Sequence, residues 1–356
     1  MRNSLRRAIQ ALLWLSLAAC GSEMTLDDAA RADAIGGADG AAMDTVGPSD
    51  TGPAADVATT DAPGADRVVG NDVQAVDVVA SDTGGVVPTD PAMRTQAQIC
   101  ARWNADFAAS RGVPGWTAPA AMCDPGVLAP ETIAAAVRMT NAYRFLAGLN
   151  DVPNNAMQNT NSQACALMMQ RNRMLSHTPP TTWICYSAAG ADGAARSNIT
   201  SGGSSPTASV AGFVDDSRDI SGTLGHRRWM LWPPLGPIGY GQTTNYACLY
   251  VIGGRGTGMK SWVAWPNEGP TPMESMSQIW SFSSRALGVG AATRAAVTRD
   301  GVAVAVTAMF RTPGYGDNTI SWMMPAITVG STYHVTISGL TGANVEYDVR
   351  PVRCGP

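Results

Sequence analysis

Two histidines bracket the stretch of this chain whose residue types suit metal binding or acid–base chemistry. His177 follows a long stretch with apolar residues at helical spacing, and Pro179–Pro180 stop that helix behind it. His226 comes later in the chain, and the acidic pair Asp215–Asp216 lies shortly before it. Imidazole and carboxylate groups bind zinc, and the same groups transfer protons. We therefore expect the functional site within this stretch.

Five short motifs around these residues resemble, in order, the motifs of a known family. They are Met139–Arg144, Ala147–Leu149, Ser176–His177, Ser197–Ile199 and Gly225–Arg227. The family is the CAP superfamily (cysteine-rich secretory proteins, antigen 5 and pathogenesis-related 1), and the resemblance is to bacterial secreted members. It covers residues 129 to about 253, a third of the chain.

The resemblance implies a central cleft in which two histidines and two acids hold a divalent metal. His177 and His226 fall in the histidine positions, Asp216 falls in one acid position, and Ser197, with Asn198 beside it in the cleft, falls in the other. Two imidazoles and one carboxylate could hold one zinc ion with water at the open position. The sequence equally supports the alternative, in which both histidines only form hydrogen bonds across a polar cleft.

A serine is a poor metal ligand and a poor base, so we expect binding rather than catalysis. Ser197, His226 and Asp216 could form a Ser-His-Asp set, but the sequence offers no oxyanion hole or sharp turn to support it. The glycine-rich stretch 253–261 has Met259 where a phosphate loop requires its lysine, and it suits an interdomain hinge better. A metal-assisted hydrolase that acts on peptide or envelope material, and a purely structural envelope protein, remain the alternatives.

Hydrophobic periodicity predicts the elements that must position the two histidines. We expect helices over residues 130–146 and 155–175, a short strand over 183–186 and a loop over 190–206 that carries Ser197. A helical turn over 210–216 and paired strands over 238–242 and 247–252 follow. This pattern favours an α-β-α sandwich, as the resemblance also implies.

The last hundred residues have the pattern of strands. Residues 295–306 are rich in strand formers and are interrupted by Asp300–Gly301, a strong hairpin signal. Residues 333–337 and 345–349 also alternate, and the alternation places His334 on the surface. We therefore predict an α+β protein in which the sandwich is followed by a small all-β, sandwich-like domain.

The N-terminus has the pattern of a bacterial lipoprotein leader. Basic residues precede a short apolar run, and small residues lead to Cys20, the expected lipid attachment site. Residues 21–92 contain no aromatic residue and carry a net charge of −12, which is typical of a disordered, acidic tether. We expect a protein that is anchored by lipid to a bacterial cell envelope and faces away from the cytoplasm.

The predicted organisation has five parts. They are a signal peptide (1–20), the tether (21–92), a disulfide-stapled extension (93–128), the CAP-like domain (129–253) and the β-rich domain (254–356). The residues from 93 onward carry a net charge of +5 without a basic stripe, so we expect no nucleic acid. The expected partner is an envelope or extracellular ligand, the membrane is reached only through the lipid, and the chain should be a monomer.

Six cysteines remain after Cys20, and an even number in an exported chain predicts three disulfides. Fifteen pairings are possible. The simplest joins neighbours along the chain: Cys100 with Cys123, Cys165 with Cys185, and Cys248 with Cys354.

Overall fold

The structure is a computed structural model of the chain, and it describes residues 90–202, 205–217 and 222–355. All of these residues belong to one compact unit. The predicted signal peptide, Cys20 and nearly all of the predicted tether lie outside the described residues. Within the described residues, no helix has the length and apolar character needed to cross a bilayer.

The first described elements lead into the predicted extension. A short 3-10 helix, η1 (Pro91–Met93), precedes helix α3 (Gln96–Ala109), which a capping box at Thr95 starts. The buried face of α3 carries Ile99 and Trp103, and the Trp103 ring meets the edge of Tyr143 of the next helix at 5.4 Å. Helix α3 therefore packs on the folded core.

Helix α4 (Pro130–Leu146) has the predicted bounds, with proline in its first turn and Gly148 at φ 69° after its end. Helix α5 (Ala156–Asn172) starts at Asn155, whose side chain accepts a hydrogen bond from the Gln158 amide. It ends three residues earlier than predicted, because Arg173 adopts a left-handed conformation at φ 53°. His177 therefore lies in the following loop and not on the helix.

The prediction for residues 183–206 was wrong in two places. Residues 183–186 form turns instead of a strand, and Cys185 has a left-handed backbone at φ 59°. The expected loop contains helix α6 (Ala188–Arg196) and strand β1 (Ser197–Ser201). The small residues there serve close packing, since a Cβ atom at Gly193 would lie 2.2 Å from the Asn161 carbonyl oxygen of α5.

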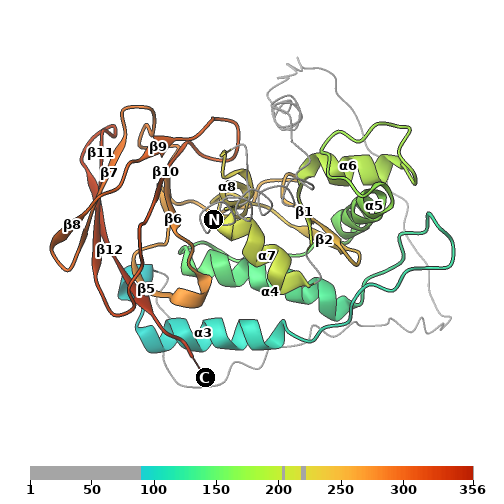
Figure 1. Cartoon of the computed structure of the whole chain (residues 1–356), viewed down its shortest axis with the longest axis horizontal. Helices are drawn as coiled ribbons and strands as arrows, with labels where there is room; N and C mark the ends of the chain where they lie inside the picture. The colour runs from blue at the N-terminus through green and yellow to red at the C-terminus, as the bar shows by residue number, and fades with distance from the viewer. Residues whose placement is uncertain (1–89, 203–204, 218–221, 356) are drawn as a thin grey trace, which may run out of the picture. The chain divides into compact units, whose positions relative to one another are not determined.

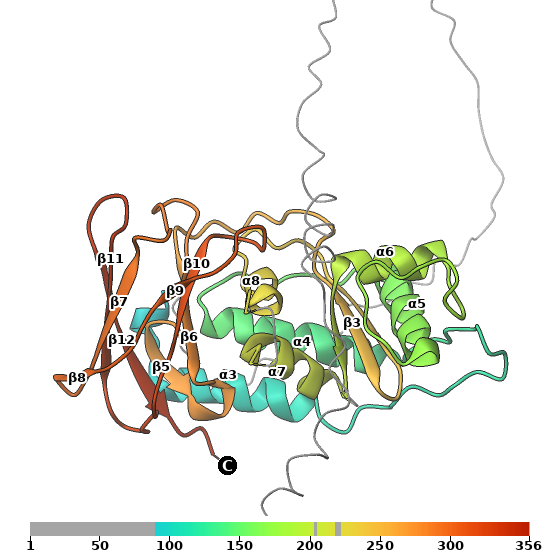
Figure 2. The ribbon, with the colours of Figure 1, turned by 45° about the horizontal axis from the view of Figure 1, so that its top comes forward.

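Strand β1 belongs to an antiparallel three-stranded sheet of order β1-β3-β2, with β2 (Gly239–Gln242) and β3 (Tyr246–Tyr250) as predicted. Helices α5 and α6 pack on one face, while α4 and α7 (Pro206–Asp215) pack on the other, and β3 lies between α5 and α4 in Figure 2. Gly241 lets α5 approach, because a Cβ atom there would lie 2.1 Å from the Ser162 carbonyl carbon. This is the predicted α-β-α sandwich.

Helix α8 (Gly225–Met230) precedes β2, and after β3 the chain enters a β-rich region, coloured orange to red in Figure 1. Its strands are β4 (Val263–Trp265), β5 (Gly269–Pro272), β6 (Ile279–Ser283), β7 (Arg294–Arg299), β8 (Val302–Val304), β9 (Met309–Phe310), β10 (Thr319–Met323), β11 (Tyr333–Ser338) and β12 (Val345–Val352), with the 3-10 helix η2 (Met273–Ser275) after β5. They form two sheets, of order β4-β6-β10-β9 and β5-β12-β11-β7-β8. Side chains from both sheets share one core, which confirms the predicted α+β class with a β-sandwich at the C-terminal end.

Two details of the β-rich region were also predicted correctly. Strands β7 and β8 form a hairpin whose turn carries Asp300 at φ 50° and Gly301 at φ 81°. His334 points away from the core side of β11, and its Nδ1 lies 2.9 Å from an Asp348 carboxylate oxygen.

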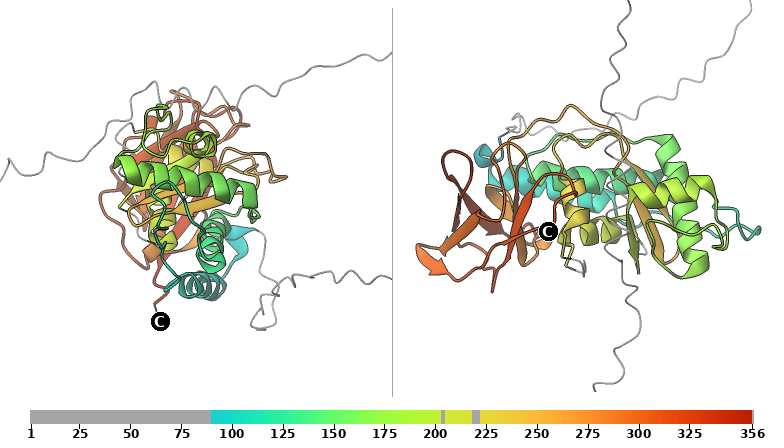
Figure 3. Two further views of the ribbon diagram at one scale, coloured as in Figure 1. Left: turned by 90° about the vertical axis from the view of Figure 1, so that its right-hand side faces the viewer. Right: turned by 90° about the horizontal axis from the view of Figure 1, so that it is seen from above.

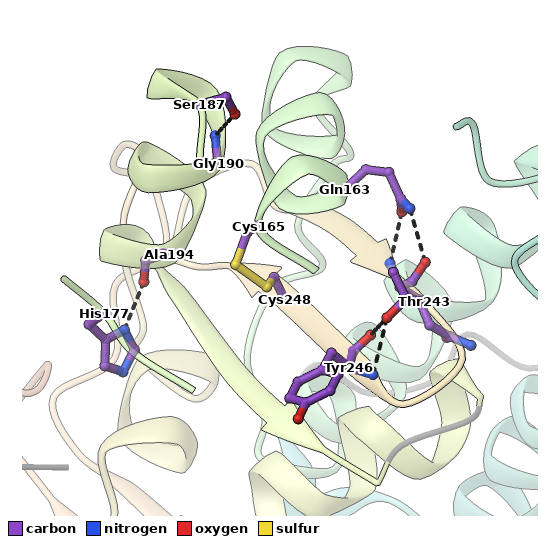
Figure 4. The surroundings of a disulfide bond; sticks show 10 residues. Gln163, Cys165, His177, Ser187, Gly190, Ala194, Thr243, Tyr246 and Cys248 are labelled. Carbon is purple, nitrogen blue, oxygen red and sulfur yellow. Dashed lines mark hydrogen bonds between the residues drawn. A yellow bond between two sulfur atoms is a disulfide. The ribbon is translucent and has the colours of Figure 1, made fainter. Parts of the chain in front are cut away.

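The neighbour pairing of the cysteines was wrong. The structure pairs Cys100 with Cys354, Cys123 with Cys185, and Cys165 with Cys248. The first bridge joins α3 to the end of the described chain, which lies beside that helix in Figure 3. The pairing follows from which surfaces meet in the fold; Cys165, for example, lies on the face of α5 that packs on β3 (Figure 4).

Candidate functional site

His226 lies in the first turn of the six-residue helix α8. Its Nδ1 lies 2.8 Å from Oδ1 of Asp216, whose side chain is 1% exposed while that of His226 is 21% exposed. The Phe213 ring packs against the imidazole at 5.3 Å between ring centroids. The ring is thus held in place, and part of it stays accessible.

Asp216 connects two helices. It ends α7 in a left-handed conformation at φ 49°, and its Oδ2 accepts a hydrogen bond of 3.3 Å from the backbone amide of Arg227 in α8. A carboxylate can only accept, so Nδ1 of His226 carries the hydrogen and Nε2 is the remaining ring nitrogen. Asp216 therefore orients His226, and a carboxylate in this position often accompanies a metal-binding histidine.

His177 is half-buried in the loop after α5, and its Nδ1 lies 2.8 Å from the carbonyl oxygen of Ala194 in the last turn of α6 (Figure 4). A carbonyl also accepts only, so His177 has the same Nδ1–H form as His226. The carbonyl of His226, in turn, accepts a hydrogen bond of 3.0 Å from the Asn198 side chain of β1. Both histidines therefore contact residues 194–198, where α6 passes into β1.

Ser197 and Asn198 point to opposite faces of the sheet, because side chains alternate along a strand. Ser197 shares its face with Ile199, which belongs to the core cluster packed against α5. Ser197 is 3% exposed, and its Oγ has no hydrogen-bond partner within the part of the chain that the structure describes. Asn198 thus faces the side of His226, and Ser197 faces the other side.

Among residues 90–202, 205–217 and 222–355, no three histidine, cysteine or acidic side chains gather closely enough to hold a metal ion. The donor set partly fits a zinc site, because both imidazoles present the tautomer that ligates through Nε2. Metal binding by His177, His226 and Asp216 stays a prediction.

Arg227 and Arg228, which follow His226, are buried, and no role was predicted for them. Burial lowers the pKa of Arg227 to about 10, and the carboxylates of Asp216 and Asp215 oppose this shift. Both guanidinium groups extend from α8 toward the β-rich region and line a small pocket there with Trp232, Trp265 and other residues. In the sequence, two consecutive arginines within an apolar stretch could have indicated that these side chains contact another part of the fold.

Residues 137–254 match the model of the CAP family, described as the cysteine-rich secretory protein family. This stretch runs from within α4 past β3 and includes both site histidines. The match supports the CAP superfamily for this part of the chain, so we describe residues 137–254 as a CAP domain and the strands β4 to β12 as the β-rich region that follows it. A comparison with curated proteins found no match to the chain.

Proposed function

We propose that this protein is an extracytoplasmic binding protein of the bacterial cell envelope, whose CAP domain binds its ligand, with a divalent metal such as zinc, at His177 and His226. The observation that carries the proposal is the fixed tautomer of both rings. Each ring donates Nδ1–H to a fixed oxygen, so Nε2 is the acceptor nitrogen of each neutral imidazole. Three disulfides also suit a compartment outside the cytoplasm.

Zinc titration by calorimetry tests the metal part of this proposal. The parent protein should bind zinc, and His177→Ala or His226→Ala should weaken binding by tenfold or more. His334→Ala is the matched control, since that histidine lies on β11 and pairs with Asp348, and it should leave affinity unchanged. Affinity should fall below about pH 6.5, where imidazole becomes protonated.

If the parent binds no zinc, the metal part of the proposal is wrong. The same two alanine variants should then still reduce retention of the protein on isolated envelope material, because the two imidazole side chains can contact a ligand directly. Retention that neither substitution changes would leave a purely structural envelope protein as the better account.

Hydrolysis is the alternative activity, because a histidine whose Nδ1 faces a buried carboxylate is the arrangement of a general base. Ser197 does not complete a triad with this pair, since it points to the other face of β1. Binding is therefore the better supported function, and metal-assisted hydrolysis of peptide or envelope material is second.

The proposal includes anchoring through a lipid on Cys20, with residues 21–92 as an acidic tether. Cys20→Ala should release the protein from membranes or block its processing, as fractionation and immunoblotting would show. A variant that is processed normally and remains in the membrane fraction would refute the anchor.

A further inference from the structure

On one face of the sheet β4-β6-β10-β9, the hydroxyl side chains of β6 and β10 form a polar row that is largely buried, next to the apolar Val263 and Trp265 of β4. Trp280 and Phe282 of β6 enter the sandwich core, so Ser281 and Ser283 lie on the opposite face. Thr319 and Ser321 of β10 pair with Ser283 and Ser281 and continue this row. Ser281, Thr319 and Ser321 are at most 5% exposed, although the outer face of a sandwich sheet usually meets water. Something in the chain must therefore cover this face.

Arg227 of α8 contacts this row at Ser281. Its Nη1 donates to the Ile279 carbonyl at 2.8 Å and to Ser281 Oγ at 3.3 Å, and its Nη2 donates to Ser277 Oγ at 3.1 Å. The other N–H groups donate within the CAP domain, to the carbonyls of Val214 at 2.6 Å and Asp215 at 2.8 Å. All five N–H groups of the guanidinium are thus engaged, and they join the end of α7 to the chain at β6.

Two further arginines make the same kind of bridge. Arg228 donates to the carbonyls of Thr223 at 3.1 Å and Thr312 at 2.7 Å. Arg311 of the β-rich region donates to Ser321 Oγ and to the Gly222 carbonyl, both at 2.6 Å. We call these arginines and the hydroxyls they contact the arginine–serine junction. It links α8 and the residue Gly222 before it to the β-rich region.

Helix α8 depends on such contacts for its position. A helix of six residues has little stability of its own, and α8 starts from Leu224 at φ 54° without a side-chain cap. Arg227 also links the Asp216–His226 pair to β6, because its backbone amide donates to Asp216 while its side chain donates to Ser281.

We infer that Ser277 and Ser281 of the β-rich region are positioning residues for His226, acting through Arg227, so that both parts of the chain build the histidine site. This inference rests on the proposed function, in which His226 binds through Nε2. Removing the two hydroxyls leaves two N–H groups of a buried cation without partners, and the guanidinium must move to find others. Such a movement shifts α8 relative to Asp216.

Long-range proton–nitrogen spectra of protein labelled with ¹⁵N-histidine test the inference, because they report which ring nitrogen carries the hydrogen. The spectra are taken above about pH 6.5, where imidazole is neutral. The parent should show His226 in the Nδ1–H form. Asp216→Ala should lose that form, and Ser277→Ala combined with Ser281→Ala should lose a large part of it, with smaller losses in each single variant.

Ser283→Ala is the matched control, because its hydroxyl lies on the same face of β6 and contacts Thr319 instead of Arg227. His334, paired with Asp348 on β11, reports in the same spectra that the β-rich region is folded. Should the single and double serine variants keep the parent signals of His226 while Asp216→Ala loses them, the inference is wrong. The experiment uses no metal, so a failure to bind zinc in the separate titration leaves its outcome unaffected.

Discussion

Removing the bridge between Cys100 and Cys354 should lower stability by about 5 kcal/mol, whichever of the two cysteines is replaced. The bridge spans 254 positions of the chain. Through the other two bridges, a shorter covalent path of about 150 residues also joins Cys100 to Cys354. Because the entropy of closing a loop depends only on the logarithm of its length, the shorter path lowers the expected stabilisation by less than about 1 kcal/mol. Alanine is the suitable replacement, because Cys354 is buried.

The informative measurement compares Cys100→Ala, Cys354→Ala and the double variant by urea unfolding, without reductant. Each single variant should cost nearly as much as the double one, because either change removes the same bridge. The midpoint of thermal unfolding should fall by roughly 10–20 °C in all three. Under neighbour pairing the two residues would belong to different bridges, so additive costs would refute the pairing described above.

Three further predictions concern stability and the limits of the folded part. Gly241→Ala should lower the free energy of unfolding by about 2 kcal/mol or more, since its Cβ would meet Ser162 of α5. Gly212→Ala lies on the exposed side of α7 with no atom within 4 Å, and it should raise the free energy of unfolding by about 0.5–1 kcal/mol. Denaturant unfolding of both variants checks these values. Burial lowers the pKa of Lys260 to about 8, so the unfolded chain binds a proton that the folded chain lacks between about pH 8 and 10.5. Stability should rise over that interval in the parent and not in Lys260→Met, as unfolding at several pH values would show. Limited proteolysis should leave a resistant fragment that starts near residues 90–100, and a protected start well before residue 80 would contradict the predicted tether.

The sequence was sufficient where local chemistry decides the structure. Helix α4 has its predicted bounds because Pro130 and Gly148 act on the backbone at those positions. The β7–β8 hairpin was predictable because Asp300–Gly301 can adopt the positive φ values that the turn requires. Helix α6 was predicted as a loop because of its many glycines and alanines. These small residues occur there because α5 packs too closely to leave room for larger side chains.

The site was less predictable, because it depends on contacts between distant segments. The motifs led to His177, His226 and Asp216, and the structure places Asp216 against His226. Nothing local indicates that Arg227 would meet hydroxyls some fifty residues later in the chain. The pairing of Cys100 failed for the same reason, since its partner is brought to α3 only by the complete fold.

The disulfide pattern has a consequence for biosynthesis. In a chain that enters an oxidising compartment from its N-terminus, Cys100 and Cys123 arrive first and Cys354 arrives last. Oxidation in order of arrival would join Cys100 to Cys123, Cys165 to Cys185 and Cys248 to Cys354, and none of these pairs is present in the structure. Maturation therefore requires either that the thiols stay reduced until the fold brings their partners together, or that early, non-native bridges are exchanged for the native ones. The yield of correctly folded protein should therefore depend on a disulfide isomerase or a thiol–disulfide buffer.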